Sequence, residues 1–461
     1  MRVVICGAGQ VGFHVAEHLA EIGHDVTVID RSPRLIRRIS DLLDVRAIEG
    51  HASDPDVLDQ AQAREADLLI AVTALDEVNM VACQVAHTLF DVPEMIARVR
   101  NPAYLDGRWR RLFGGEHGLP FGPDRVIAPE REVSRAIYAR LEVPGAFESV
   151  RLVDDRVRVL GLHLDDSCPV LDTPLRQLTE LFPDLAVRVL AVERDNRIWV
   201  PTSDDQLLAG DDIYIAVAAD QVARAMGAFG HEERAARNLV IVGGGEVGVG
   251  LARIIEQEDR HTQIKLIERD EERAAHAADQ VTRTVVLNGD ALEPDILHEA
   301  GIEDAETIIT VTNSDQVNIL SALLGKHFGC QRSIALINKA TFAPLVHGIG
   351  VDVRVDPRAT TVSSILRHIR RGGIRDVRTV ADGKGELLEA RLLDRSRIVH
   401  KTIREADFPL GVVVGALVRD DEIIIPRPDT VLEAGDRLVI FAERDAVKEV
   451  EHLLMLDVGY Y

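Results

Sequence analysis

The chain has 461 residues, of which 46% are hydrophobic and 28% charged, so it can form several globular domains and is too apolar for a disordered protein. Its formal net charge of −23 argues against a nucleic-acid-binding protein, because affinity for a phosphate backbone depends on clustered lysine and arginine. No apolar stretch approaches the roughly twenty residues that cross a bilayer, and we expect no signal peptide. Four widely spaced cysteines predict buried, reduced thiols with no metal and no disulfide partner.

The first elements form a dinucleotide-binding pattern. An apolar strand at residues 3–5 leads into a G-x-G-x-x-G sequence at residues 7–12, which opens a helical pattern. The first glycine of this motif permits a tight turn, the second lets the backbone approach a pyrophosphate, and the third lets the helix pack closely on the strand. The next strand, at 26–29, ends in Asp30, where a carboxylate accepts hydrogen bonds from ribose hydroxyls. The pattern predicts a phosphate site and not a catalyst.

Short apolar strands then alternate with helical segments, which is typical of a doubly wound parallel sheet. We expect these strands at 68–72, 96–99 and 126–127. The sequence therefore predicts a first Rossmann-like nucleotide-binding domain over residues 1–140 and a small α+β module over residues 141–230.

The same order of elements begins again 236 residues after the first glycine motif. A strand at 239–242 leads into the glycine sequence 243–248, and the following strand ends in Glu268. Residues 72–79 are matched by residues 311–318 at a constant offset of 239. We therefore predict a second Rossmann-like domain over residues 237–375.

A second pair of repeats follows the two nucleotide-binding patterns. Residues 194–211 align without a gap on residues 419–436, with nine identical positions. This pair predicts a second small α+β module over residues 376–461. The fold class is thus α/β, with two tandem Rossmann-like doubly wound parallel sheets, each followed by a small α+β module. The charged stretch 231–237 reads as a linker, and we expect a cut there to separate two foldable halves.

This organisation resembles the regulator-of-potassium-conductance family, and the resemblance extends over essentially the whole chain. It is carried by residues 6–12, 73–86, 96–100 and 126–130. It implies domains that bind NAD(H), and in some members ATP or ADP. It further implies a homo-oligomeric ring, expected as a tetramer, that docks under a potassium-translocating membrane subunit and gates it. The chain would then be cytoplasmic and peripheral on the inner face of the membrane.

The segment 104–124 departs from the family pattern, because it is longer and contains several glycines and two prolines. We interpret it as a surface loop, with a partner-binding loop as the alternative.

Sixteen residues are predicted to bind nucleotide. In the first site, the loop lies around the pyrophosphate, Asp30 on the ribose, His51 near the adenine by analogy with the family, and Thr73 and Ala74 at the end of the fourth strand. Arg98 lies near the end of the fifth strand, where it would compensate phosphate charge or pair with a neighbouring domain. The full set is Gly7, Gly9, Gln10, Val11, Gly12, Asp30, His51, Thr73, Ala74, Arg98, Gly243, Gly245, Val247, Gly248, Glu268 and Asp290.

The two predicted sites differ in charge. The second has Leu336 and Asn338 where the first has Arg98 and Arg100, and Glu246 lies inside its loop. Because a carboxylate repels a pyrophosphate and a lost cation removes charge-assisted hydrogen bonds, we predict that the first site binds highly charged nucleotides more tightly. The acids at both strand ends argue against NADP, whose 2′-phosphate they repel, although an arginine follows each of them.

Two other functions fit the same fingerprint. An NAD-dependent dehydrogenase uses this fold, but the small modules lack a convincing constellation of His, Lys or Tyr. A nucleotide-sensing scaffold for a partner outside transport fits the residues nearly as well, and only the family resemblance favours the potassium-channel regulator.

Overall fold

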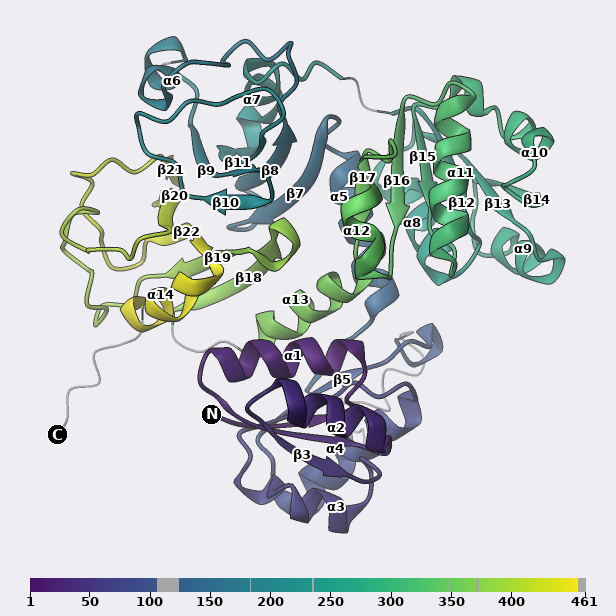
Figure 1. Cartoon of the computed structure of the whole chain (residues 1–461), viewed down its shortest axis with the longest axis vertical. Coiled ribbons are helices and arrows are strands. Elements are labelled where there is room, and N and C mark those ends of the chain that lie inside the picture. The colour runs from purple at the N-terminus through teal and green to yellow at the C-terminus, as the bar shows by residue number, and fades with distance from the viewer. Residues whose placement is uncertain (106–123, 183, 234–235, 347, 370–372, 455–461) are drawn as a thin grey trace. The chain divides into compact units, whose positions relative to one another are not determined.

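The structure is a computed structural model that describes residues 1–105, 124–182, 184–233, 236–346, 348–369 and 373–454 (Figure 1). These residues form two parallel six-stranded sheets and two antiparallel five-stranded sheets. Each parallel sheet is followed along the chain by one antiparallel sheet, which confirms the predicted α/β fold class. Most of the loop expected over 104–124 lies outside the described residues.

The chain divides into two units by its internal contacts. The first unit comprises Met1–Glu132 together with Thr360–Ile369, and the second comprises Val133–Ala359 together with Arg370–Tyr461. The first unit therefore contains a short segment from far along the sequence.

The first unit is built on a parallel sheet with the strand order β3-β2-β1-β4-β5-β6. Its central strands are buried along almost their whole length, as expected for a parallel sheet covered by helices on both faces. The strand order reverses beside β1, and doubly wound sheets bind ligands at the carboxyl ends of the strands at this position. The strands are β1 Arg2–Cys6, β2 Asp25–Asp30, β3 Arg46–Glu49, β4 Leu68–Ala71, β5 Glu94–Arg98 and β6 Arg125–Ile127, and the helices are α1 Gln10–Glu21, α2 Pro33–Leu42, α3 Pro55–Gln60 and α4 Asp76–Phe90.

The second parallel sheet repeats this topology with the order β14-β13-β12-β15-β16-β17. Its central strand pairs with both neighbours in parallel, as β1 does in the first copy. The strands are β12 Asn238–Val242, β13 Gln263–Glu268, β14 Val285–Asn288, β15 Thr307–Thr310, β16 Arg332–Leu336 and β17 Val353–Val355, and the helices are α8 Glu246–Glu258, α9 Glu271–Ala278, α10 Pro294–Glu299, α11 Asp315–His327 and α12 Ala343–Val346.

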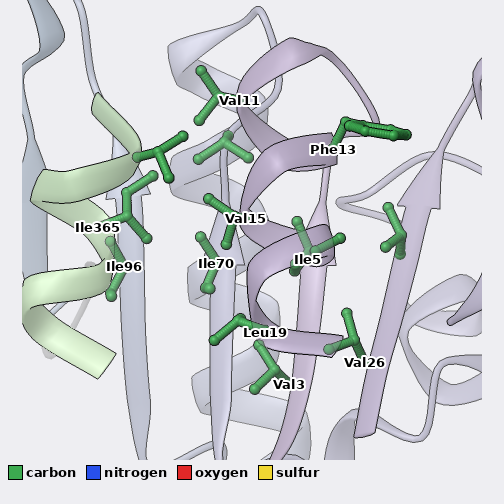
Figure 2. Packing of buried hydrophobic residues seen from close by; sticks show 14 of the residues in the cluster. Val3, Ile5, Val11, Phe13, Val15, Leu19, Val26, Ile70, Ile96 and Ile365 are labelled. Carbon is green, nitrogen blue, oxygen red and sulfur yellow. The ribbon is translucent and has the colours of Figure 1, made fainter. Parts of the chain in front are cut away.

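The last helix of each copy packs on the sheet of the other copy. Ile365 of α13 (Pro357–Ile369) lies in the core of the first unit beside Ile96, on the opposite side of the view from Val26 (Figure 2). In the second unit, Val133 and Ile137 of α5 (Pro129–Leu141) belong to the core of the second parallel sheet. A cut in the linker 231–237 would remove one covering helix from each sheet, so the structure does not support the expectation of two independently foldable halves.

The two small modules have the same topology. Their strand orders are β10-β9-β11-β8-β7 and, read in the equivalent direction, β21-β20-β22-β19-β18. The strands are β7 Ala146–Leu152, β8 Val157–His163, β9 Val187–Arg194, β10 Arg197–Trp199, β11 Asp212–Ala218, β18 Ile374–Val380, β19 Gly385–Arg391, β20 Val412–Arg419, β21 Glu422–Ile424 and β22 Arg437–Glu443, and the helices are α6 Leu175–Leu181, α7 Val222–Ala228 and α14 Val447–Leu454. Residues of both modules, including Leu190 and Phe441, share one hydrophobic core.

The sequence identity between the modules includes a repeated buried ion pair. Arg194 binds Asp211 through two hydrogen bonds of 2.6 and 2.7 Å, and Arg419 binds Asp436 through two of 2.8 Å. Both aspartates are almost fully buried, and each also accepts a backbone N–H within its own turn. These repeated residues therefore stabilise the modules and are not part of a nucleotide site.

Candidate nucleotide-binding sites

The glycine loops have the geometry that the sequence predicts. Gly7 and Gly243 adopt φ values of +115° and +113°, which favour glycine at the turn after the first strand. A Cβ on Gly12 would run into the carbonyl oxygen of Gly7, so the third glycine is required for close packing of helix and strand. By contrast, no heavy atom lies within 4 Å of a Cβ placed on Gly9.

The start of each following helix is open to a ligand. Gly9 and Gly245 are the N-cap residues of α1 and α8, and neither helix has a side-chain cap. The N-terminal N–H groups of a helix attract anions, and the open space at both N-cap glycines lets a pyrophosphate approach the backbone. The residues present thus fit a dinucleotide at both loops.

In the first copy, the acid at the end of β2 is held in place by two backbone N–H groups. Ala8 N donates to Asp30 Oδ2 at 2.7 Å, and Ser32 N donates to Asp30 Oδ1 at 2.8 Å. An ionised carboxylate has about four acceptor positions, so each oxygen can still accept from a ribose hydroxyl. Asp30 is therefore both fixed in position and available to a ribose.

The acid at the end of β13 in the second copy accepts more hydrogen bonds than Asp30 does. Glu268 accepts from Gly244 N at 2.8 Å, from Asp270 N at 3.0 Å and from the guanidinium of Arg273 at 3.0 Å. Its longer side chain folds back under the loop, and a Cβ on Gly244 would lie only 2.9 Å from the Cβ of Glu268. In the first copy, the loop residue is larger and the acid is shorter, because Ala8 replaces Gly244 and Asp30 replaces Glu268.

A buried asparagine connects the ends of two strands in each copy. Asn79 is fully buried; its Oδ1 accepts from Thr73 N at 2.8 Å and its Nδ2 donates to the carbonyl of Arg98 at 2.9 Å. Asn318 makes the equivalent bonds to Thr312 N and to the carbonyl of Leu336, both at 2.8 Å. Neither asparagine is among the predicted site residues, although their equivalent positions in the repeat are a signal for both.

Arg98 lies at the carboxyl end of β5 and points into the protein. The side chain is 8% exposed, and its Nη2 donates to the carbonyl oxygen of Thr73 at 2.7 Å. Within the described residues, its Nε has no hydrogen-bond partner. Burial, and then the neighbouring Arg100, lower the pKa of Arg98 to about 10, so the guanidinium remains charged at neutral pH. A charged, partly unpartnered guanidinium at this edge fits an anionic ligand.

The second copy has a guanidinium at the same edge on a different element. Leu336 and Asn338 replace Arg98 and Arg100, but Arg358 is the second residue of α13, where the first copy has Glu130. The Nε of Arg358 lies 3.6 Å from Asp356, and among the described residues its Nε and Nη2 lack hydrogen-bond partners. Arg358 is not among the predicted site residues because it lies on a helix and not at a strand end.

The remaining predicted residues lie around the same strand ends. The turns that contain His51 and Asp290 begin with glycines whose N–H groups donate to the backbone carbonyls of Asp30 and Glu268, each at 3.0 Å. His51 is exposed and lies 2.9 Å from Ser53. The others lie in the first turns of α1 and α8 or just after β4; these are Gln10, Val11, Gly248, Val247 and Ala74.

All four cysteines are buried and free. Burial raises the pKa of Cys6, the last residue of β1, to about 12. A thiol with this pKa is unreactive near neutral pH, which agrees with a structural role. Among the described residues, no helix is both long and apolar enough to cross a membrane.

Models of two domain families match most of the chain. The TrkA-N domain matches residues 3–111 and 239–357, and the TrkA-C domain matches residues 155–230 and 387–455. The chain is 46% identical over 461 residues to the Trk system potassium uptake protein TrkA of Azorhizobium caulinodans, with complete coverage of both proteins. The chain belongs to the TrkA family. It is also 37% identical over 465 aligned residues to the TrkA protein of Halomonas elongata, again with complete coverage of both.

Solved structures place this TrkA-family chain in a known architecture. The crystal structure of the GsuK RCK domain aligns with a TM-score of 0.59 and 20% identity, covering 98% of this chain and 94% of that chain. The GsuK channel bound to NAD aligns with the same score and identity, covering 98% of this chain and 78% of that chain. The fold is therefore that of tandem RCK domains, as the resemblance seen in the sequence predicted.

Proposed function

We propose that this chain is a non-catalytic, nucleotide-sensing subunit that binds NAD(H) and gates a potassium-translocating membrane subunit of Trk type. ATP and ADP are further candidate ligands. Three findings support the proposal: the duplicated dinucleotide fold, the full-length relatives named as Trk potassium uptake proteins, and the NAD bound in the similar GsuK channel. A cytoplasmic ring, expected as a homotetramer on the inner face of the membrane, follows from the same relationship.

The roles of the residues follow from the geometry of the strand ends. The loop from Gly7 to Gly12 would bind the pyrophosphate through backbone N–H groups, and Asp30 would accept from the adenosine ribose. Thr73 would face the ligand at the end of β4, and the inward-turned guanidinium of Arg98 would compensate phosphate charge from behind it, with Asn79 as a positioning residue. Binding and orientation are the only tasks that these groups perform.

The observation that carries the gating function is the exchange of α5 and α13. Each helix begins directly after the last strand of one nucleotide-binding sheet and packs on the sheet of the other copy. At the start of α5, Glu130 lies 3.8 Å from the guanidinium of Arg100. A nucleotide that binds one position of these helices more tightly than another shifts the equilibrium between them, whereas tight binding alone switches nothing.

The first test is calorimetric titration of the full chain with NADH, NAD, ATP and ADP. We expect one or two sites per chain, with the first site lost in Asp30→Ala and the second in Glu268→Ala. A chain that binds none of these nucleotides would refute the sensing function. Steady turnover of NADH in a broad substrate screen would instead support the dehydrogenase.

The second test measures potassium flux. We expect the chain to co-purify with a membrane potassium transporter and to make potassium uptake depend on nucleotide in proteoliposomes that contain both proteins. If the chain binds NADH but co-purifies with a partner outside transport and leaves the flux unchanged, the scaffold alternative is correct. Mass determination of the purified chain tests the tetramer.

The predicted asymmetry between the sites is tested inside the full chain, because the exchanged helices make isolated halves unsuitable. Glu246→Gln removes the carboxylate from the second loop, and we expect it to tighten ATP binding at the second site while leaving the first unchanged. A second site that already binds ATP as tightly as the first would contradict the prediction and would point to compensation by Arg358.

A further inference from the structure

An exposed basic surface follows Asp30 in a chain whose net charge is −23. Arg31, Arg34, Arg37 and Arg38 are all exposed on α2 and the residues before it. Within the part of the chain that the structure describes, none of these four arginines forms an ion pair with a carboxylate. Their positive charge is therefore available to a ligand.

Three of these arginines, Arg34, Arg37 and Arg38, line a shallow cavity of about 670 Å³ next to the predicted ribose site. The lining residues are Ser32, Pro33, Arg34, Arg37, Arg38, Asp41 and Leu42. At one end of the cavity, Ser32 donates its N–H to Asp30 Oδ1, and the Ser32 side chain does not cap the helix. The guanidinium of Arg38 is supported by the ring of Phe13, 4.6 Å from its centroid. The cavity therefore begins where the ribose hydroxyls of a nucleotide held by Asp30 would lie.

The second copy is less basic at the same positions. Counted from Glu268, Arg269 keeps the charge of Arg31, but Asp270 and Glu272 replace Ser32 and Arg34, and Ala275 and His276 replace Arg37 and Arg38. The carboxylate of Asp270 caps α9 by accepting from Arg273 N at 2.9 Å. The two copies therefore share the glycine loop and the strand-end acid, but the second has acidic residues where the first has Ser32 and Arg34 beyond the ribose.

We propose that the first site accepts an adenosine nucleotide with an additional phosphate on its ribose, as in NADP(H), and that the second site rejects it. This inference rests on the proposed function, because it requires a nucleotide on the loop from Gly7 to Gly12. A nearby arginine is the group that accommodates a 2′-phosphate in this fold, and guanidinium groups bind phosphate through paired charge-assisted hydrogen bonds.

The carboxylate of Asp30 opposes this phosphate, as the sequence alone suggested. However, both oxygens of Asp30 already accept backbone N–H groups. Three guanidinium groups line the cavity, whereas the opposing negative charges are the carboxylates of Asp30 and Asp41. The balance of charge beside the ribose therefore favours the additional phosphate.

Titration of the full chain with 2′,5′-ADP and with 5′-AMP isolates the additional phosphate. We expect 2′,5′-ADP to bind the first site at least about tenfold more tightly than 5′-AMP. Arg34→Ala should reduce the affinity for 2′,5′-ADP at least about tenfold more than the affinity for 5′-AMP. The matched control is Arg46→Ala, which removes an exposed arginine of the same unit outside the cavity and should change neither affinity.

The outcomes separate this inference from the proposed function. If NADH binds but 2′,5′-ADP binds no better than 5′-AMP, or if Arg34→Ala weakens both equally, the inference is overturned and the proposed function stands. If neither NADH nor 5′-AMP binds, both are overturned. Binding of the wild type, but not of Arg34→Ala, to phosphatidylglycerol vesicles without any preference for the 2′-phosphate would also overturn it and would assign the arginines to a lipid surface.

Discussion

The complementary pairs beneath the two glycine loops lead to a sharp prediction about the second site. Gly244 N donates to Glu268 Oε2, and a Cβ on Gly244 would lie 2.9 Å from the Cβ and 3.2 Å from the Cγ of Glu268. In the first copy, Ala8 already carries a Cβ next to the shorter Asp30. We therefore expect Gly244→Ala to disrupt the second loop, and Glu268→Asp not to restore it, because aspartate keeps the Cβ that is in the way.

The size of the effect follows from where the clash lies. The Cβ of Glu268 is fixed to strand β13 and cannot rotate away, so either the strand or the loop must shift. Overpacking of this kind costs about 1–3 kcal/mol. The same range corresponds to an increase of about 5- to 150-fold in the equilibrium for local opening of residues 243–249.

Hydrogen exchange of the full chain, followed by mass spectrometry on peptides, measures this local opening. A multidomain chain of 461 residues does not unfold in one transition, so a local probe is more informative than a melting temperature. We expect faster exchange around Gly244 in Gly244→Ala, no recovery in the variant that also carries Glu268→Asp, and unchanged exchange around Gly7. The matched control is Ala8→Gly, which relieves no clash and should cost less than about 1 kcal/mol.

Two results would refute the reasoning. Wild-type exchange in Gly244→Ala would show that the loop absorbs the Cβ without strain. Recovery in the double variant would show that the length of the Glu268 side chain, and not its Cβ, sets the clash.

Three further predictions concern polar side chains that hydrogen bonds hold in place. Asn79→Ala leaves Thr73 N and other backbone groups without a partner, which costs about 1–3 kcal/mol for each group. We expect this variant to weaken NADH binding at the first site only, and Asn318→Ala to weaken it at the second site only. Calorimetric titration measures the two effects separately. Arg419→Met leaves the carboxylate of Asp436 buried without its guanidinium, and should destabilise the second module by about 1–3 kcal/mol in local hydrogen exchange; protection equal to wild type would contradict this. Although partial burial opposes it, hydrogen bonds from a threonine hydroxyl and three consecutive backbone N–H groups lower the pKa of Glu256 from 4.5 to about 2. The stabilisation is therefore present above about pH 4.5 and is lost as the pH falls towards 2. The difference in hydrogen-exchange protection of residues 282–284 between wild type and Glu256→Gln should therefore be larger at pH 7 than at pH 3.

Much of the nucleotide site was predictable because its signals are local in the sequence. The spacing of the glycines, the apolar strand before them and the acid about twenty residues later each depend on backbone geometry within one β-α-β unit. The internal repeat strengthened the prediction, since a pattern found twice at a constant offset is rarely accidental. The same repeat pointed to the paired arginine and aspartate of the small modules, whose structural role only the buried contacts revealed.

The orientation of individual charged side chains was not predictable in this way. The sequence located Arg98 at a strand end but could not show that its guanidinium turns inward to the carbonyl of Thr73. It showed the loss of that cation in the second copy but not the presence of Arg358 on the next helix, because the two positions become neighbours only when β17 pairs with β16.

The sequence by itself determined the duplicated α/β architecture, the positions of both glycine loops and the acids that follow them. Only the tertiary structure decided which sheet α5 covers and which sheet α13 covers. The periodicity of α5 and α13 shows that each helix has an apolar face, but any apolar surface of suitable shape can bury such a face, and hydrophobic burial has no direction along the chain. The exchange of these helices between the copies, on which the proposed coupling depends, is therefore a property of the folded chain and not of its sequence pattern.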